Sequence, residues 1–285
     1  MKHLNTYITE YIVKKKLDKP IDSEYSYHPQ TKEELFKNIK ELLDKGETDF
    51  NCIDTSAITD MSNLFRSLNV STTIDVSNWD VSNVTNMSNM FYNCKNSKFE
   101  GLENWDVSNV KDMHYMFSKC TNMNFNIINW DVSNVENMES MFGGCENFKG
   151  EGLENLNVSN VKDMSFMFTN CKNFIGEGLE NWNVSKVEDM QDMFFDCQNF
   201  TGKGIEKWDV SNVKNMRCMF EQCKKFNCDL NNWNVSNVIN MESMFENCKN
   251  FNCNLSKWNI HKVKYMNYMF DGCTSLKNKP SWYEE

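Results

Sequence analysis

Residues 79–84 read Trp-Asp-Val-Ser-Asn-Val, and residues 86–94 read Asn-Met-Ser-Asn-Met-Phe-Tyr-Asn-Cys. The same two segments return every 25 or 26 residues along the chain. A degenerate first copy, with Ile53 in place of Trp79, brings the number of units to nine. The later copies of the Trp79 position are Trp105, Trp130, Leu156, Trp182, Trp208, Trp233 and Trp258. A fixed period of this length predicts a repeat solenoid.

Each unit combines two periodicities. Trp79 and Val81 would lie on one face of an extended segment, with Asp80 and Ser82 on the other, which predicts a short strand buried on one side. In the segment 86–94 the apolar residues fall at i, i+3, i+4 and i+7, which predicts a two-turn helix. An Asp or Asn just before the first Met is typical of a helix N-cap. These residues are Asp60, Asn86, Asp112, Asn137, Asp163, Asp189, Asn215 and Asn240.

Such short elements must bury their apolar faces against neighbouring units. The sequence therefore predicts an α/β repeat solenoid with parallel strands about 4.8 Å apart and a total length of about 45 Å. Residues 1–50 are expected to form an N-terminal cap with a helix at about 31–45, since Thr31 and Glu34 form a capping box. Residues 51–276 would form the solenoid, and residues 277–285 a tail or an incomplete last repeat.

Composition and charge exclude several classes of protein. A hydrophobic fraction of 40% argues against wholesale disorder. The formal charge of -10, with Arg66 and Arg217 as the arginines, argues against nucleic-acid binding. No apolar run is long enough to span a bilayer, and no signal peptide, lipid attachment or anchor is recognised, so membrane insertion is not expected and the chain as written would stay in the cytoplasm or a host cell.

The repeated pattern resembles a known family. Trp-Asp-Val-Ser-Asn-Val, followed by Asn/Asp-Met-x-x-Met-Phe-x-x-Cys and x-x-Phe, is similar to the BspA-like leucine-rich-repeat surface proteins, in particular to their 25-residue branch found in mycoplasma lipoproteins. The resemblance covers residues 53–276. It implies a solenoid of the leucine-rich-repeat type, a location at the cell surface, and adhesion or protein binding. It supplies no catalytic residues.

The cysteines are expected to be reduced thiols of the core. Leu68 occupies their position in the first unit, so the position requires a small or medium apolar side chain, which a free Cys provides. Paired Cys-x-x-Cys spacings for zinc are missing. The eight cysteines of this column are Cys94, Cys120, Cys145, Cys171, Cys197, Cys223, Cys248 and Cys273.

No catalytic, cofactor or metal site is predicted. The four histidines lie in unrelated places, so no nucleophile–base pair can be proposed. Asp80, Asp106 and Asp131 share one column and could hold a cation, but Asn replaces Asp in later units and dilutes the charge. A polysaccharide hydrolase of the β-helix type is the weakest alternative, because its sites gather Asp with Arg or Lys on adjacent steps.

The expected function is therefore non-enzymatic binding of a protein, or of a glycan, with an intracellular scaffold or host-interaction protein as the alternative. The proposed contact surface is the outward side of the predicted strands, where small polar residues repeat. A more irregular partner would use the side of the predicted helices, which varies between units. The outward residues are Asp80, Ser82, Asp106, Ser108, Asp131, Ser133, Asn157, Ser159, Asn183, Ser185, Asp209, Ser211, Asn234 and Ser236.

Overall fold

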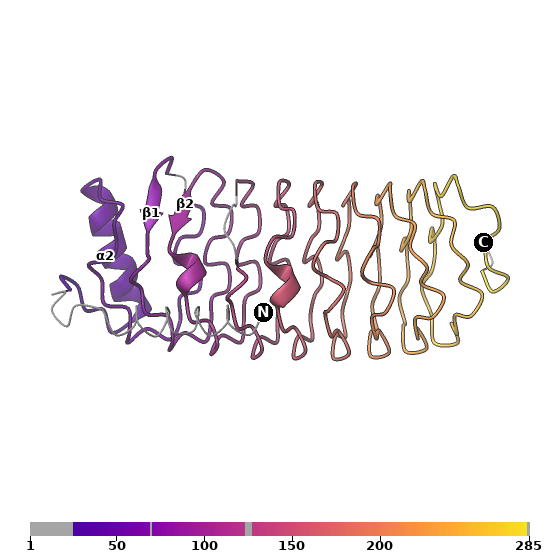
Figure 1. The fold of residues 1–285 in the computed structure, drawn as a ribbon, viewed down its shortest axis with the longest axis horizontal. Coiled ribbons are helices and arrows are strands. Elements are labelled where there is room, and N and C mark those ends of the chain that lie inside the picture. Colours follow the sequence, from indigo (N-terminus) through magenta and orange to yellow (C-terminus); the bar gives the residue numbers. More distant parts are fainter. Residues whose placement is uncertain (1–24, 69, 123–126, 284–285) are drawn as a thin grey trace, which may run out of the picture.

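The computed structural model describes residues 25–68, 70–122 and 127–283, and these form a solenoid whose coils stack along one long axis (Figure 1). Part of the predicted cap, residues 1–24, lies outside the described residues. Isolated parallel bridges join equivalent positions in nine successive steps. The bridged positions are Asp60, Asn86, Asp112, Asn137, Asp163, Asp189, Asn215, Asn240 and Tyr265. The predicted repeat solenoid is therefore confirmed.

Helix α2 (Lys32–Asp44) lies at the N-terminal end of the stack (Figure 1). Thr31 is its N-cap and accepts a hydrogen bond from the Glu34 backbone N–H at 3.2 Å. The Glu34 carboxylate reaches back to the backbone N–H of Gln30 at 2.7 Å, one residue earlier than in a standard capping box. The apolar face of the helix packs on the first steps through Leu35, Ile39 and Leu42. No described helix is long and apolar enough to cross a membrane.

The helix predicted in each repeat is not formed, and α2 is the one α-helix of the described residues. Asn89 and Asn93 have φ angles of 57° and 63°, which a right-handed helix excludes. The segment is instead a series of tight turns, in which Met90 N–H bonds Met87 C=O at 3.2 Å and Cys94 N–H bonds Phe91 C=O at 3.1 Å. Successive turns bring the apolar residues back to the same side, so the apolar stripe is buried although no helix carries it.

The backbone hydrogen bonds between steps lie mainly in these turns and not in the predicted strands. Alternate N–H groups of one step donate to carbonyls of the next step, at 2.6 to 3.0 Å. In the first full repeat the pairs are Met87 to Asp112, Asn89 to His114, Phe91 to Met116 and Asn93 to Ser118. Each of these peptide groups donates its N–H to the following step and accepts at its C=O from the preceding step. The result is a series of hydrogen-bonded columns along the solenoid. Parallel pairing between repeats was predicted correctly. It occurs, however, in the segment predicted to be a helix and not in the predicted strand.

The predicted strand at residues 79–84 is likewise replaced by a turn, in which Val84 N–H donates to Val81 C=O at 2.9 Å. The two strands of the described chain are β1 (Thr73–Asp75) and β2 (Lys98–Glu100), which pair in parallel with Ile74 opposite Phe99. They lie near α2 (Figure 1). The alternation of burial predicted for residues 79–82 holds without a strand, since Trp79 and Val81 are buried and the residues between and after them are not.

Two short 3-10 helices, η1 (Leu102–Asn104) and η2 (Leu153–Asn155), lead into the Trp position of their steps. The residue before η1, Gly101, has a φ of 92°, and a Cβ there would lie 2.1 Å from the Ser77 Cα. A glycine is therefore required at this position by both the backbone angle and the space.

Aromatic columns fill the core. Phe91 and Phe117 stack with their ring centroids 5.4 Å apart, and Trp79 and Trp105 stack at 6.2 Å with an interplanar angle of 2°. Each indole N–H also donates to a carbonyl of the preceding step, as in Trp130 to Leu102 at 2.9 Å. The Trp column continues into the predicted incomplete last repeat, because Trp282 stacks on Trp258. The buried tryptophans therefore leave no indole donor unsatisfied.

Leu156 interrupts this column and supplies no indole donor to the carbonyl of Ile127. We expect Leu156→Trp to raise the free energy of unfolding by about 1 kcal/mol, the net value of one hydrogen bond. Urea denaturation measures the change. Leu156→Phe is the matched control, because it adds a ring without the N–H. An equal gain in both variants would assign the effect to ring burial alone.

Candidate functional site

The outward polar residues form two columns along the solenoid, and most of the Asp and Asn side chains in them are exposed. They are held by a repeated turn. The Asp80 Oδ1 atom accepts the Ser82 backbone N–H at 3.0 Å and the Ser82 hydroxyl at 2.7 Å. Asn157 accepts the Ser159 N–H in the same way at 3.2 Å. Because this turn needs only an acceptor, Asp and Asn serve equally well, which explains their alternation in the column.

A second set of hydrogen bonds ties these turns together along the stack. The Asn109 side-chain amide donates to the Ser82 carbonyl of the preceding step at 2.8 Å, and Asn134 does the same to Ser108 at 2.8 Å. Much of the polarity of the outer columns is therefore structural. What is left for a ligand is the second carboxylate oxygen of each Asp and the exposed edge of the turns. No set of three or more His, Cys, Asp or Glu residues in the described ranges is placed to hold a metal ion.

The Asp or Asn residues predicted as helix N-caps use their side chains as predicted, but at a turn. Ser88 N–H donates to Asn86 Oδ1 at 2.9 Å, and Glu139 N–H donates to Asn137 Oδ1 at 2.9 Å. An acceptor two residues before a free N–H closes an Asx-turn, and Asx-turns and N-caps share the same residue preference. The residue type therefore predicted the hydrogen bond from a backbone N–H to the side chain, but not the backbone conformation around it.

The twelve cysteines are free thiols in the structure. Those of the core column make a hydrogen bond that an aliphatic residue could not: Cys120 Sγ donates to Phe91 C=O at 2.9 Å, and Cys145 Sγ donates to Phe117 C=O at 3.1 Å. Burial raises the pKa of the Cys145 thiol to about 12. The Cys145 thiol is therefore protonated and shielded at neutral pH, which fits a structural and not a nucleophilic cysteine.

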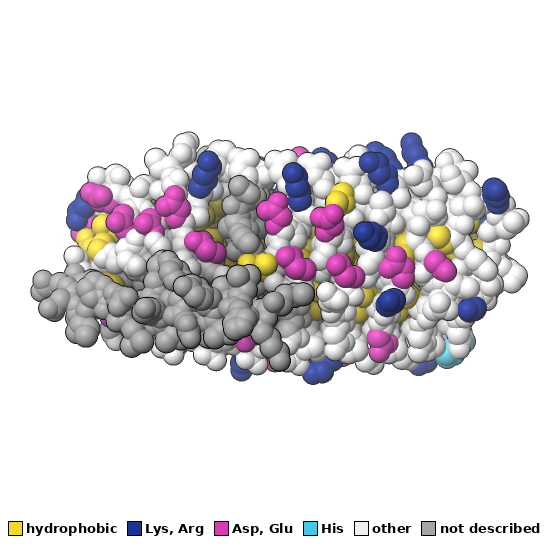
Figure 2. All heavy atoms as spheres, viewed as in Figure 1, with side chains coloured by type: hydrophobic (Ala, Val, Ile, Leu, Met, Phe, Trp, Pro, Cys, Tyr) yellow, Lys and Arg dark blue, Asp and Glu magenta, His cyan; other side chains and the backbone are white. Residues whose placement is uncertain are grey.

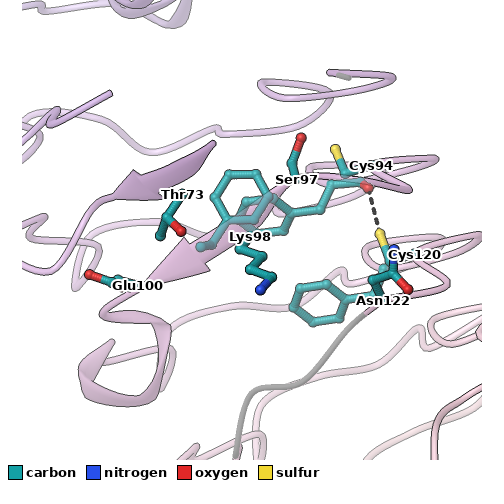
Figure 3. Close-up of a pocket in the computed structure, with 10 residues that line it drawn as sticks. Thr73, Cys94, Ser97, Lys98, Glu100, Cys120 and Asn122 are labelled. Carbon is teal, nitrogen blue, oxygen red and sulfur yellow. Dashed lines mark hydrogen bonds between the residues drawn. The ribbon is translucent and has the colours of Figure 1, made fainter. Parts of the chain in front are cut away.

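A cavity of about 230 Å³ opens between β2 and the step that follows it (Figure 3). Phe91, Phe99 and Phe117 are its aromatic lining residues. Cys94 and Cys120 also line it and lie close to one another (Figure 3). Later steps carry a second buried phenylalanine three residues after the column cysteine, as in Phe148 and Phe174, where this step has Ser97. The smaller side chain of Ser97 accounts for part of this space.

The segments of tight turns equivalent to residues 86–94 also contain a polar cluster that was not predicted from the sequence. Asp192 is only 7% exposed, and its Oδ2 atom has no hydrogen-bond partner among the described residues. The nearest cation is Arg217, whose Nη1 lies 3.6 Å from this oxygen and whose Nε lies 3.3 Å from Glu242 Oε2. Burial raises the pKa of the Asp192 carboxyl above its usual range. The Arg217 charge opposes this effect but does not cancel it.

Three overlapping segments of the chain, residues 30–97, 90–177 and 169–283, match the model of one protein family, described as "Mycoplasma protein of unknown function, DUF285". The chain belongs to the DUF285 family. Each of the three matched segments spans several of the stacked steps. None of the curated proteins compared matches the chain.

A solved structure, the crystal structure of a TLR13–ssRNA13 complex, shares 12% sequence identity with the DUF285 chain at a TM-score of 0.26. The alignment covers 86% of this chain and 48% of the solved one, so the DUF285 chain spans about half the length of that protein. A likeness at this level carries no conclusion about function.

Proposed function

We propose that this DUF285 protein is a non-enzymatic binding module that presents the outer Asp/Asn and Ser columns to an extended protein ligand, with a glycan as the second ligand class. The observation that carries the proposal is the repetition of the same exposed turn on successive steps of a rigid stack. Many weak contacts at a regular spacing add to a usable affinity. The similarity to BspA-like leucine-rich-repeat surface proteins supports an adhesive role at the cell surface.

The turn hydrogen bonds also favour binding physically. In each turn one side-chain oxygen is already fixed by the Ser N–H, as in Asp106 with Ser108 at 3.2 Å and Asp131 with Ser133 at 3.0 Å. The second oxygen is therefore held in a defined direction before a ligand arrives. Preorganised groups lose less entropy on binding than mobile ones do. The N-terminal steps carry the charge, because Asp80, Asp106 and Asp131 give way to Asn in the next two steps.

The double substitution Asp106→Lys with Asp131→Lys tests this surface. The ligand is first found by screening the purified protein against a panel of extracellular-matrix and serum proteins and a glycan array. We expect the lysine pair to weaken binding of the best ligand by about ten-fold or more, by reversing two charges at the contact. Biolayer interferometry gives the Kd of each variant.

The control is Asp106→Asn with Asp131→Asn, which keeps the turn acceptors and should preserve the melting temperature. If binding survives the lysine pair but is lost with Tyr115→Ala and Phe166→Ala, the ligand uses the segments equivalent to residues 86–94. The outer columns are then not the site.

A further inference from the structure

The cavity beside β2 occurs where the regular packing of the repeats changes. In later steps Phe148, Phe174 and Phe200 lie three residues after the column cysteine and stack on the Phe column, with centroid distances of 4.6, 4.6 and 4.2 Å. Ser97 occupies this position in the step of Cys94. Its buried side chain is much smaller than a phenyl ring, and a space of about 230 Å³ is present beside it.

The buried polar groups that line the cavity already have hydrogen-bond partners in the protein. The Ser97 hydroxyl donates to the Leu68 carbonyl at 3.1 Å and accepts the Val70 N–H at 3.3 Å, both in the preceding step. The Cys94 and Cys120 thiols donate to backbone carbonyls at 3.0 and 2.9 Å. Since these groups need no water as a partner, the inner part of the cavity suits an apolar ligand group.

Three phenylalanines supply the apolar part of the lining. Phe91 and Phe117 are buried and stack with their ring centroids 5.4 Å apart. Phe99 is half-buried and meets Phe91 edge to face at 4.4 Å. Aromatic rings attract one another in both arrangements, so a flat aromatic ring is the ligand group that this lining matches best. The volume is sufficient for one ring or two fused rings, since an apolar cavity of about 150 Å³ holds benzene.

The cavity also has a cation among its lining residues. Lys98 extends from β2 toward the other lining residues, whereas Glu100 extends in the opposite direction (Figure 3). The Lys98 ammonium forms no hydrogen bond or ion pair with the part of the chain that the structure describes. An unpaired cation beside an aromatic lining fits a ligand that has both an aromatic ring and an anionic group.

We propose that this cavity binds a small aromatic carboxylate, with its ring against Phe91, Phe99 and Phe117 and its carboxylate at the Lys98 ammonium. The ring fills the space that Ser97 leaves, and the carboxylate supplies the acceptor for the lysine. The cavity is separate from the outer polar columns. The proposal therefore does not depend on the proposed function.

Indole-3-acetate is the probe, and indole-3-acetamide is its neutral counterpart. Ligand-observed NMR titration of the full chain measures both Kd values. We expect indole-3-acetate to bind with a Kd of about 1 mM or below, as for a ligand of this size. The amide should bind about five-fold more weakly, because it lacks the charge-assisted hydrogen bond. No binding of indole-3-acetate, or equal binding of the acid and the amide, would overturn the proposal.

Lys98→Gln should weaken binding of indole-3-acetate about five-fold and change that of the amide by less than about two-fold. Lys149→Gln is the matched control, because Lys149 has the equivalent position in a step where Phe148 takes the place of Ser97. It should leave both Kd values unchanged. Both lysines are exposed, so neither substitution should alter the melting temperature. Equal effects of the two substitutions would indicate general charge attraction and overturn the proposal.

Thr73→Phe tests the position of the ring. Thr73 lines the cavity from β1 and is half-buried, so a phenyl ring there should occupy the space and abolish binding of both indole compounds. Thr72→Phe is the control, because the preceding residue is exposed and is not part of the lining. If Thr73→Phe lowers the melting temperature, Thr73→Leu replaces it as a smaller filler. Unchanged binding of both compounds by the Thr73 variant would place the ring elsewhere and overturn the proposal.

Discussion

Deleting residues 156–181, one whole repeat, is expected to leave a shorter folded solenoid. The deletion joins Asn155 to Trp182, so every apolar column stays in register. Met138 N–H, which now donates to Asp163 C=O at 3.0 Å, would meet the equivalent carbonyl of Asp189. Each step contacts mainly its neighbours, so a step can be removed if the two new neighbours match. Circular dichroism and gel filtration should show a folded protein of smaller size with a lower melting temperature.

Deleting residues 156–168, half of the same repeat, should have a far larger effect. It removes Phe168 and the first turns of the step but keeps Cys171 and the return loop, so buried columns and hydrogen-bond donors lose their partners on both sides. Unpaired buried backbone groups are costly, and the exposed core promotes aggregation. A half-repeat variant that melts at the wild-type temperature would contradict the stacked model of stability.

The period and the core columns were predictable from the sequence because burial alone fixes them. The backbone was not, because apolar residues at i, i+3, i+4 and i+7 return to one side in a helix and in a series of tight turns alike. The signal that separates the two is the left-handed residue. The column of Asn93 is enriched in Gly and Asn, the residue types that adopt positive φ most easily, with Gly144, Asn170, Asn247 and Gly272 among its members beside Ser67, Lys119, Asp196 and Gln222.

In the other column of left-handed residues, the residue types do not predict a positive φ. It includes Tyr115, Phe166 and Cys218, with φ angles of 56°, 58° and 52°. Such residues adopt this conformation at a cost of about 1–2 kcal/mol each. Each of them donates its N–H to the next step, as Phe166 does to Gln191 at 2.8 Å, so the stacking imposes the angle. Tertiary contacts here override local preference, which a reading of single repeats does not detect.

The candidate sites divide in the same way. The outer polar columns were visible in the sequence because they repeat, although their turn-forming role emerged only from the hydrogen bonds of Asp80 with Ser82 and their equivalents. Asp192 was not singled out, because Asp and Asn are common throughout the turn segments. Its burial depends on the neighbouring step, which brings Arg217 to 3.6 Å. A residue such as Asp192 is therefore recognised from its burial and its neighbours in the structure, and not from the sequence repeat.

Phe168→Ala should lower the free energy of unfolding by about 3–5 kcal/mol, as for other buried aromatic residues. Its side chain is fully buried, and its ring lies near five other aromatic rings. Its ring neighbours are Phe142 at 5.7 Å, Phe148 at 6.3 Å, Phe174 at 4.6 Å, Trp182 at 6.1 Å and Phe194 at 5.6 Å. The rigid turns on both sides limit how far the steps can close over the resulting cavity, which favours the upper part of this range.

Urea denaturation followed by tryptophan fluorescence measures this loss, because Trp182 lies against the altered ring. Phe36→Ala is the matched control: the same atoms are removed from a side chain that is 53% exposed on α2, and the effect should be small. If the two variants unfold at the same urea concentration, the Phe column does not stabilise the solenoid as a continuous core. If Phe168→Ala instead unfolds in two stages, the cavity has separated the steps on its two sides, which is the behaviour expected of a chain whose stability is a sum of neighbouring contacts.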